Sequence, residues 1–421
     1  MYALIADGFS YLQSQSGLSL LLLFWYVFIF EIPRYTVNFA IALLFSKHPG
    51  DMAPDLIDGE RISVIVAGHN EEDAIERCVL ALHEQSRPPD EIIVVSDGST
   101  DRMAEKIGTL LRHGLIDSAH ATELRAGKSA AVNLADRSVT GEIMINIDCD
   151  CSFDRHAFRN IVKPFVDPDI GAVSGNILVR NPQKSLVTAF QAIEYLISVS
   201  MGKQAAAQLG QVTCASGAFS AFRQTALHGV GGMDAGGGED LDVTLRLRQA
   251  GWQIDFAESA ICYTDVPDTL TALTRQRFRW ERDAVRLRYR KHIDLMNPFS
   301  PQFNWVELVH EVEFFFFHIV AAIALPIYLV WLFFTYGDLA PIVLVAAQAG
   351  LVVMDVFTFS LAAIATPKVR SRTLLPYLLG YSIFNGFLMR FIRIAAYMQE
   401  WVFKASYKDT YVPDKVHRVR G

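Results

Sequence analysis

Residues 143–150 read Ile-Met-Ile-Asn-Ile-Asp-Cys-Asp, a mainly apolar run that leads into two aspartates. Such a run is typical of a strand buried in a parallel sheet, and open α/β sheets bind ligands at the carboxyl ends of their strands. Since alternate residues of a strand point the same way, Asp148 and Asp150 are predicted to face one site. Two carboxylates there suit a divalent cation such as Mg²⁺ that carries a diphosphate; a strand followed by a polar turn is the simpler alternative.

Strand-like and helix-like segments alternate around this stretch. Residues 62–67 and 91–96 are apolar runs typical of strands, and residues 71–85 between them carry apolar side chains on one helical face. This alternation predicts an α/β domain over residues 60–266, with a mostly parallel sheet covered by helices.

The composition indicates a soluble domain joined to membrane helices. Hydrophobic residues make up 51% of the 421 positions and charged residues 20%, with a mean hydropathy of +0.24. The net charge of −7 gives no support to nucleic-acid binding. The five cysteines lack metal-finger spacing, so we expect reduced thiols on the cytosolic side, with Cys149 and Cys151 as packing residues.

The N-terminal region is apolar enough to enter a membrane. Residues 1–48 are predicted to form an anchor built on one long helix over residues 17–46. Pro33 would kink this helix, and Glu31 and Arg34 are spaced to form an ion pair on it.

Three apolar segments near the other end predict three transmembrane helices within residues 311–403; they are residues 313–335, 340–365 and 374–402. The basic loop before the third segment predicts that this loop and the α/β domain lie on the cytoplasmic side, which places the basic tail 404–421 outside.

Ionisable side chains occur inside these apolar segments. Asp355, Arg390, Arg393 and His318 are candidates to line a polar channel, since intramembrane charges usually face a cavity or path. A structural ion pair between Asp355 and Arg390 is the alternative.

A basic segment, residues 267–310, precedes the apolar region. Its residues 275–292 read RQRFRWERDAVRLRYRKH. Arginines interleaved with aromatic residues predict interfacial helices on the cytoplasmic lipid surface, and a solvated charged helix is the alternative.

Two motifs follow the first two predicted strands. Residues 68–72 read GHNEE and residues 96–101 read SDGSTD, and in both motifs the acidic residues could simply cap the next helix. Residues 127–133 read GKSAAVN and place Lys128 after a glycine at a helix start, an arrangement that contacts phosphate.

Two further motifs lie downstream. Residues 236–240 read GGGED and put Asp240 at the head of a helix, where a carboxylate can act as a general base or merely cap. Residues 276–280 read QRFRW and offer a cation for a phosphate and an aromatic face for a sugar ring.

The order and spacing of these motifs resemble the membrane-embedded, processive family 2 glycosyltransferases, the group that contains cellulose, chitin, hyaluronan and poly-N-acetylglucosamine synthases. The resemblance covers about residues 60–300 and rests on GHNEE, SDGSTD, GKSAAVN, DCD, SGAFSAFR, GED and QRFRW. It implies a GT-A type, Rossmann-like glycosyltransferase domain flanked by transmembrane and amphipathic interfacial helices. The QxxRW element resembles the processive subclass.

The resemblance also implies roles for single residues. Asp240 matches the general base, and Asp150 with Asp148 matches the ligands of Mg²⁺ or Mn²⁺. The donor-binding positions are Glu71, Asp97, Lys128, Asp148 and Arg279, and the acceptor-binding positions are Ser216, Gly217, Glu239, Gln276 and Trp280. Two features depart from the family pattern: Gly238 stands where Thr is usual, and charged residues 281–283 follow QRFRW.

These roles imply an inverting enzyme that polymerises a UDP-sugar, UDP-N-acetylglucosamine or UDP-glucose, into a β-linked polysaccharide. The growing chain would cross the plasma membrane, which is the inner membrane in a bacterium. The implied partners are the donor, the polysaccharide acceptor, the bilayer and export or regulatory proteins. A transferase that adds one sugar to polyprenyl phosphate or another lipid is the alternative.

Overall fold

The computed structural model describes residues 10–34, 36, 60–210, 212, 214–234, 236–301, 303–366 and 371–408. Within these residues the strands form one sheet in the order β3-β2-β1-β4-β7-β6-β8-β5. The strands are β1 (Ile62–Gly68), β2 (Glu91–Asp97), β3 (Ser118–Thr122), β4 (Ile143–Asp148), β5 (Ser152–Phe153), β6 (Ile170–Val179), β7 (Phe219–Arg223) and β8 (Gln253–Thr264).

Among the described residues the sheet is mixed, with four parallel and three antiparallel strand pairs, so the predicted parallel pairing holds for most of it. β1 is parallel to β2 and β4, β2 to β3, and β6 to β8, whereas β7 runs antiparallel to β4 and β6, and β5 antiparallel to β8. The motifs GHNEE, SDGSTD, GKSAAVN and DCD follow strands of the parallel half. The reversal of β7 is set by pairing between distant segments, which strand–helix alternation does not report.

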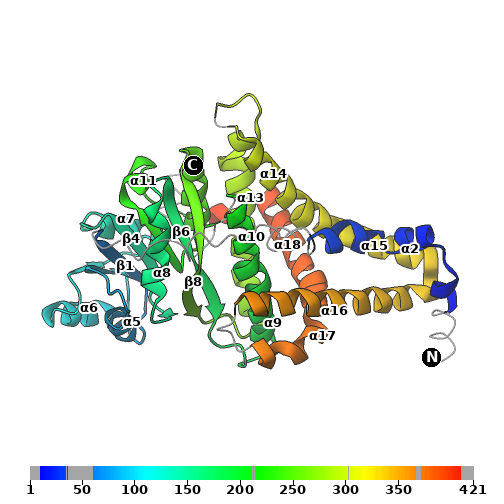
Figure 1. Cartoon of the computed structure of the whole chain (residues 1–421), viewed down its shortest axis with the longest axis horizontal. Helices are drawn as coiled ribbons and strands as arrows, with labels where there is room; N and C mark the ends of the chain where they lie inside the picture. Colours follow the sequence, from blue (N-terminus) through cyan, green and yellow to red (C-terminus); the bar gives the residue numbers. More distant parts are fainter. Residues whose placement is uncertain are drawn as a thin grey trace.

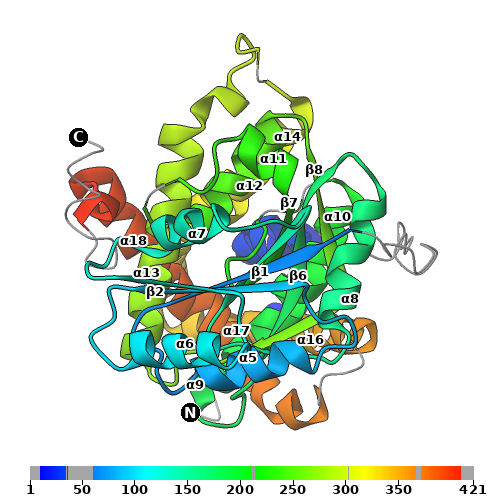
Figure 2. The same ribbon diagram turned by 90° about the vertical axis from the view of Figure 1, so that its left-hand side faces the viewer.

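Helices cover both faces of the sheet because strand side chains alternate. Val64 and Val66 pack in one core with α5, α6 and α8, while Ile65 and Ala67 pack in the other with α7, α11 and α12. Figure 2 shows α5 and α6 below the sheet and α7, α11 and α12 above it. These helices are α5 (Ile75–His83), α6 (Met103–Arg112), α7 (Lys128–Asp136), α8 (Ala157–Val162), α11 (Gln224–Gly229) and α12 (Glu239–Gln249).

The parallel strands end together at one edge. Ala67 pairs in register with Val95 and with Asp148, so β1, β2 and β4 deliver their following loops to the same place. Cys149 and Cys151 are buried in the core beside this edge, as predicted. The fold therefore brings the first three acidic motifs to neighbouring positions.

Four helical elements lie between the sheet and the apolar helices (Figure 1). α13 packs along α18, and η3 packs against α16. These elements are α9 (Leu186–Glu194), η3 (Tyr195–Met201), α10 (Gly202–Gln208) and α13 (Leu270–Arg286), and the apolar helices are α14 (Trp305–Phe314), α15 (Ala321–Tyr336), α16 (Ala340–Ala365), α17 (Leu378–Ile383) and α18 (Met389–Phe403).

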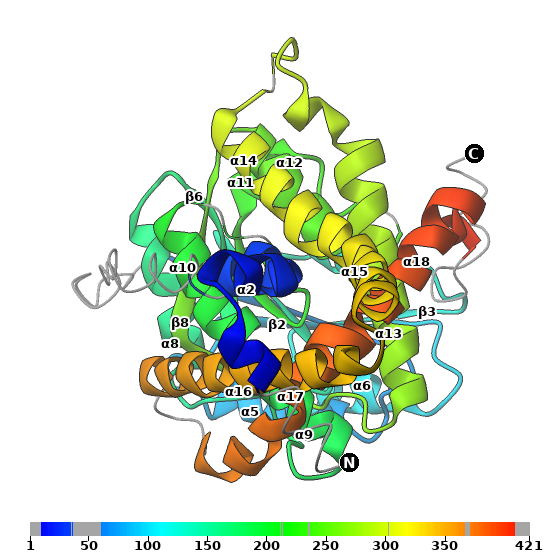
Figure 3. The ribbon, with the colours of Figure 1, turned by 90° about the vertical axis from the view of Figure 1, so that its right-hand side faces the viewer.

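Two helical stretches in the described residues, Trp305–Ala365 and Ser371–Phe403, are long and apolar enough to cross a membrane. The first has 61 residues, which at roughly 1.5 Å per residue is far longer than a single crossing of about 30 Å. The chain reverses at its midpoint, where Gly337 adopts φ +52, and α15 and α16 form a hairpin (Figure 1). Figure 3 views the molecule from the turn of this hairpin.

The N-terminal segment packs on the hairpin. Gly17–Leu23 and Val27–Arg34 are bent by 80° relative to each other, and the pair gives a third candidate span if it is counted as one. The predicted position of the kink at Pro33 is therefore wrong in the described part of this helix, because the bend precedes the proline. Tyr26 donates a hydrogen bond to the carbonyl oxygen of Ala321 at 3.0 Å and fixes the segment against α15.

Buried ion pairs connect these helices. Glu31 pairs with Arg390 rather than with Arg34, so the predicted i,i+3 pair and the Asp355–Arg390 alternative are both replaced by a contact between distant segments. Arg393 pairs with Glu281 of α13 at 2.9 Å. Both arginines are thereby engaged in structural contacts between helices, and the polar channel stays a prediction.

Glu31→Ala is expected to lower the free energy of unfolding by about 3 kcal/mol, because it leaves the buried Arg390 guanidinium without its counter-charge. Thermal unfolding in detergent measures the change. Lys184→Ala removes an exposed partner of Asp268 and should leave the midpoint unchanged. Equal midpoints for parent and Glu31→Ala would contradict the importance of the pair.

Candidate active site

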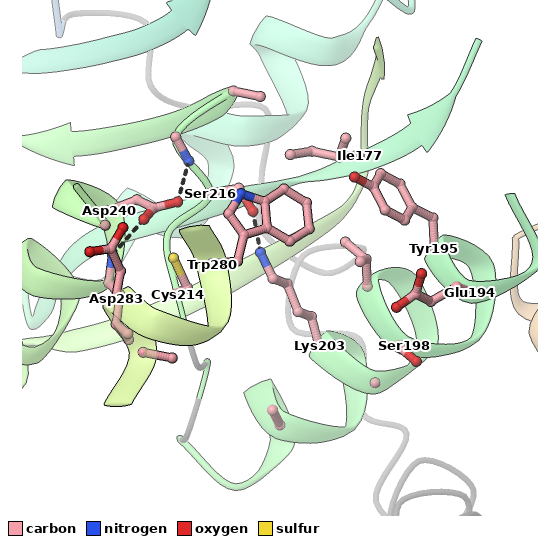
Figure 4. A pocket seen from close by; sticks show the side chains of 18 of the residues that line it. Ile177, Glu194, Tyr195, Ser198, Lys203, Cys214, Ser216, Asp240, Trp280 and Asp283 are labelled. Carbon is pink, nitrogen blue, oxygen red and sulfur yellow. Dashed lines mark hydrogen bonds between the residues drawn. The ribbon is translucent and has the colours of Figure 1, made fainter. Parts of the chain in front are cut away.

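A cavity of about 680 Å³ lies beside the carboxyl end of β4. It is bounded by the start of α7, by η3 and α10, by the loop before β7, and by α12, α13 and the α14 region (Figure 4). The predicted site residues in its lining are Lys128, Asp148, Ser216, Gly217, Glu239, Asp240, Gln276, Arg279 and Trp280. Motifs far apart in the sequence therefore meet in one cavity.

Gly217 links the two sides of this cavity. Lys128 Nζ forms an ion pair with Asp148 and donates a hydrogen bond to the Gly217 carbonyl oxygen at 2.8 Å. Asn146 Nδ2 donates to the same oxygen at 2.9 Å. The N–H of Gly217 donates to Asp240 Oδ2 at 3.1 Å, so one residue connects the lysine–aspartate pair to the carboxylate of α12.

Asp97 shapes the loop that precedes Lys128. Its carboxylate is buried and accepts hydrogen bonds from the N–H groups of Ala126 and Gly127, each at 2.7 Å. Gly98 has φ +60, and a Cβ there would lie 2.2 Å from the backbone nitrogen of Arg125. Asp97 thus holds the start of α7, and its predicted contact with the donor stays a prediction.

Several carboxylates lie close together at the carboxyl ends of β1 and β4. Burial, followed by the charges of Asp150 and Asp148, raises the pKa of Glu71, and burial followed by Asp148 raises the pKa of Asp150. Within the described ranges no group of three or more His, Cys, Asp and Glu side chains is arranged to hold a metal, and Glu71, Asp97 and Asp150 are not part of the cavity lining. The excess negative charge nevertheless fits a divalent cation whose remaining ligands come from a diphosphate.

The glycine run before α12 is required by close packing against α13. Gly238 has φ +67, and a Cβ at Gly237 would lie 2.3 Å from Asp283 Oδ2. Arg286 donates to the Gly237 carbonyl oxygen at 2.6 Å. A β-branched residue is strained at positive φ, which explains why glycine replaces threonine at position 238.

Glu239 is the second acid at the head of α12. Burial is the main reason that its pKa rises from 4.5 to about 7, and the neighbouring Asp240 adds to the rise, while Lys128 opposes it. A carboxyl group with such a pKa can hold or release a proton near neutral pH. This property was not visible in the sequence, where the two acids looked alike.

The sequence motifs also did not indicate Asp242, which anchors α12. Asp242 is buried and accepts hydrogen bonds from His292 at 2.8 Å and Lys291 at 2.5 Å, and it pairs with Arg246 at 2.8 Å. Its own burial opposes ionisation, but the bonds from His292 and Lys291 outweigh it and lower the pKa of Asp242. These contacts fix α12, and with it Asp240, to the segment that follows α13.

α13 presents QRFRW to the cavity. The Arg277 guanidinium pairs with buried Glu194 at 2.6 Å and lies 4.6 Å from the centre of the Trp280 ring. Arg288, farther along the chain, pairs with buried Glu311. These two arginines contact buried acids inside the protein. The predicted position of the segment at the lipid surface stays a prediction.

The lining also contains residues that the motifs did not indicate. Glu194, Tyr195 and Lys203 come from the helical segment between β6 and β7, which sequence reasoning left without a role. The lone lysine in an otherwise small and apolar stretch, at position 203, was the available signal.

Comparison with known families decides the class of the domain. The family described as "Glycosyltransferase like family 2" matches residues 60–282, which is more than half of the chain. The chain belongs to this glycosyltransferase family. The predicted family resemblance and enzyme class are confirmed.

Solved structures agree with this assignment. A mannosyltransferase from Pyrobaculum calidifontis, determined in complex with GDP-Man and Mn²⁺, is similar with a TM-score of 0.57 and 23% identity, over 87% of this chain and 96% of that chain. This likeness concerns the fold, and it confirms the GT-A type domain.

Curated relatives are similar over part of their length. The poly-β-1,6-N-acetyl-D-glucosamine synthase of Staphylococcus aureus (strain MSSA476) is 32% identical over 252 residues, which cover 59% of this chain and 57% of the relative. The synthase of the same name from Staphylococcus epidermidis is 30% identical over 226 residues, or 52% and 54% of the two chains. This glycosyltransferase thus spans somewhat over half the length of the curated relatives that it matches.

Glu239→Gln is expected to remove a pH-dependent part of the stability. Because the pKa of Glu239 is raised from 4.5 to about 7, the folded state binds more protons than the unfolded state between these pH values. The contribution of this carboxyl is therefore present below that window and is lost as the pH rises through it. Unfolding midpoints of the substituted protein should lack this decline. Glu105→Gln on α6 should keep the parent's profile, and an unchanged profile for Glu239→Gln would show that the residue does not titrate there.

Proposed function

We propose that this glycosyltransferase is processive and inverting, and that it polymerises UDP-N-acetylglucosamine, or else UDP-glucose, into a β-linked polysaccharide. The observation that carries the proposal is the single cavity lined by the Lys128–Asp148 pair, Asp240 and Trp280. The names of the staphylococcal relatives favour UDP-N-acetylglucosamine as the donor.

The donor diphosphate is assigned to Lys128 and Arg279, two residues of the cavity lining. Both are cations, and fixed cations stabilise the charge that develops on the leaving UDP. Asp97 supports this role indirectly because it holds the loop before Lys128. Glu71 lies at the neighbouring strand end, where we assign it to the nucleoside part.

A divalent cation, Mg²⁺ or Mn²⁺, is assigned to Asp150 with Asp148. Burial and mutual repulsion raise the pKa values of Asp150 and Glu71, so a cation would relieve an excess of negative charge there. The similar archaeal mannosyltransferase was determined with Mn²⁺. When bound, the cation would neutralise the diphosphate and so favour its departure.

Asp240 is assigned as the general base. Its Oδ2 is held by the N–H of Gly217, and the carboxylate borders the cavity. Asp240 takes the proton from the acceptor hydroxyl as that oxygen attacks the anomeric carbon on the face opposite UDP. One displacement inverts the configuration, so an α-linked donor yields a β-linked product.

The acceptor is assigned to the side formed by Ser216, Gln276 and Trp280. The Trp280 ring is 40% exposed, although Arg277 lies near one of its faces, and it can stack on a terminal sugar. We place Glu239, the other acid at the head of α12, on this side as well.

The cavity lining also includes Phe314, Phe317 and His318 of the apolar helices, so the cavity extends to these helices. We assign this continuation as the start of the export path of the polymer. The assignment supports a multi-pass protein of the plasma membrane with a cytoplasmic catalytic domain, and the basic loop before the last apolar segment supports the same orientation.

Asp240→Asn is expected to lower sugar transfer by about 10²–10³ or more, because the amide cannot accept the hydroxyl proton. UDP binding should persist. UDP release by purified membranes given UDP-N-acetylglucosamine and UDP-glucose measures transfer, and product sizing separates a polymer from a single glycolipid. Asp268→Asn, a change at a surface ion pair, is the control. Normal turnover in Asp240→Asn would rule out this base, and a glycolipid product would favour the lipid-acceptor alternative.

Asp150→Asn is expected to abolish sugar transfer. Addition of a divalent cation should then no longer change the rate. The substitution removes one of the two carboxylates assigned to the cation and also relieves their repulsion. Transfer is measured with EDTA and after addition of Mg²⁺ or Mn²⁺. Full activity of the parent protein in EDTA would remove the cation from the proposal.

A further inference from the structure

Lys203 is a buried cation in the wall of the cavity that none of the assigned roles uses. It is 9% exposed, and its ammonium group donates hydrogen bonds to Ser174 Oγ at 2.9 Å and to Ser216 Oγ. Burial lowers the pKa of Lys203, although Cys214 and Asp240 act in the opposite direction. Figure 4 shows the side chain rising from α10 toward Ser216.

The hydrogen-bond directions around Lys203 are fixed by donor and acceptor chemistry. An ammonium group donates and never accepts, so both serine oxygens are acceptors toward it. Ser174 uses its own proton on the carbonyl oxygen of Gly175 at 3.2 Å and also accepts the N–H of Ser216 at 3.3 Å. Ser174 is thereby fully engaged within the protein.

Ser216 is in a different position. Its oxygen accepts from Lys203, so its hydroxyl proton must be donated elsewhere. In the part of the chain that the structure describes, this hydroxyl donates to no protein group, and Ser216 lines the cavity. The N–H of the next residue, Gly217, donates a hydrogen bond to Asp240. The Ser216 hydroxyl therefore lies near the assigned base.

We propose that Lys203 is a positioning residue that makes Ser216 a fixed hydrogen-bond donor to an oxygen atom of the acceptor sugar. The inference rests on the proposed function, because it needs a sugar on this side of the cavity. The recognised oxygen is either a hydroxyl or the carbonyl of an N-acetyl group, since both accept hydrogen bonds. The ammonium form of Lys203, which the nearby Cys214 and Asp240 favour, can only donate to Ser216.

The test is steady-state kinetics of the full chain in membranes, with a β-1,6-linked N-acetylglucosamine oligosaccharide as acceptor and UDP-N-acetylglucosamine as donor. Ser216→Ala and Lys203→Met are each expected to raise the acceptor KM about tenfold, with kcat and the donor KM within about twofold of the parent. The double variant should be no worse than either single variant, because both act through one bond. Lys203→Arg still only donates, and it is expected to keep the acceptor KM within about threefold.

A second acceptor identifies the oxygen. The matching oligosaccharide of glucosamine lacks the carbonyl group, so an effect of Ser216→Ala confined to the acetylated chain assigns the carbonyl, and an equal effect on both assigns a hydroxyl. Lys184→Met, which removes an exposed lysine paired with Asp268, is the matched control and should change nothing.

Three results would overturn this inference and leave the proposed function intact. They are an acceptor KM within about twofold of the parent in Ser216→Ala, additive losses in the double variant, and a parallel loss of UDP affinity that marks a purely structural role. Ser216→Ala leaves the lysine in place, so it decides the matter even if Lys203→Met fails to fold. A parent protein that transfers no sugar from any UDP-sugar would overturn the proposed function and this inference with it.

Discussion

The backbone of Gly217 is the point on which the site depends. Its carbonyl oxygen accepts from Lys128 and Asn146, and its N–H donates to Asp240. Backbone groups have fixed directions, so these bonds set the distance between the lysine–aspartate pair and the carboxylate of α12. The two halves of the proposed reaction are therefore placed relative to each other by one residue.

α13 is a second brace, and it connects the site to the apolar helices. Its Arg286 holds the Gly237 carbonyl oxygen beside the head of α12. Its Glu281 pairs with Arg393 of α18 and accepts a hydrogen bond from Tyr397 at 2.7 Å. Because these contacts lie on different sides of one helix, α13 joins the GGGED loop, the QRFRW motif and the last apolar helix. Of the charged residues 281–283 after QRFRW, an apparent departure from the family pattern, Glu281 is one of these bracing groups and Asp283 pairs with the other, Arg286.

The helical segment formed by α9, η3 and α10 contributes two charged residues, Glu194 and Lys203, to the cavity wall. Glu194 neutralises Arg277 and so stabilises the cation near Trp280, while Lys203 orients Ser216. Neither residue belongs to a motif, yet each controls a motif residue through one short contact. The motif residues of the cavity are thus held in place partly by the helical segment that packs behind them.

The sequence alone determined which residues stand at the ends of strands and at the heads of helices. Apolar runs, turn glycines and the spacing of acids are local, so they placed Asp97, Asp148 and Asp240 correctly, and the motif order indicated the family. The direction of β7 and the partners of buried charges were decided only in the tertiary structure. Glu31 and Arg390 are 359 positions apart, and a buried arginine can be neutralised by any acid that packing brings near it. The local sequence shows which buried charge needs an ion-pair partner. The packing of distant segments decides which residue becomes that partner.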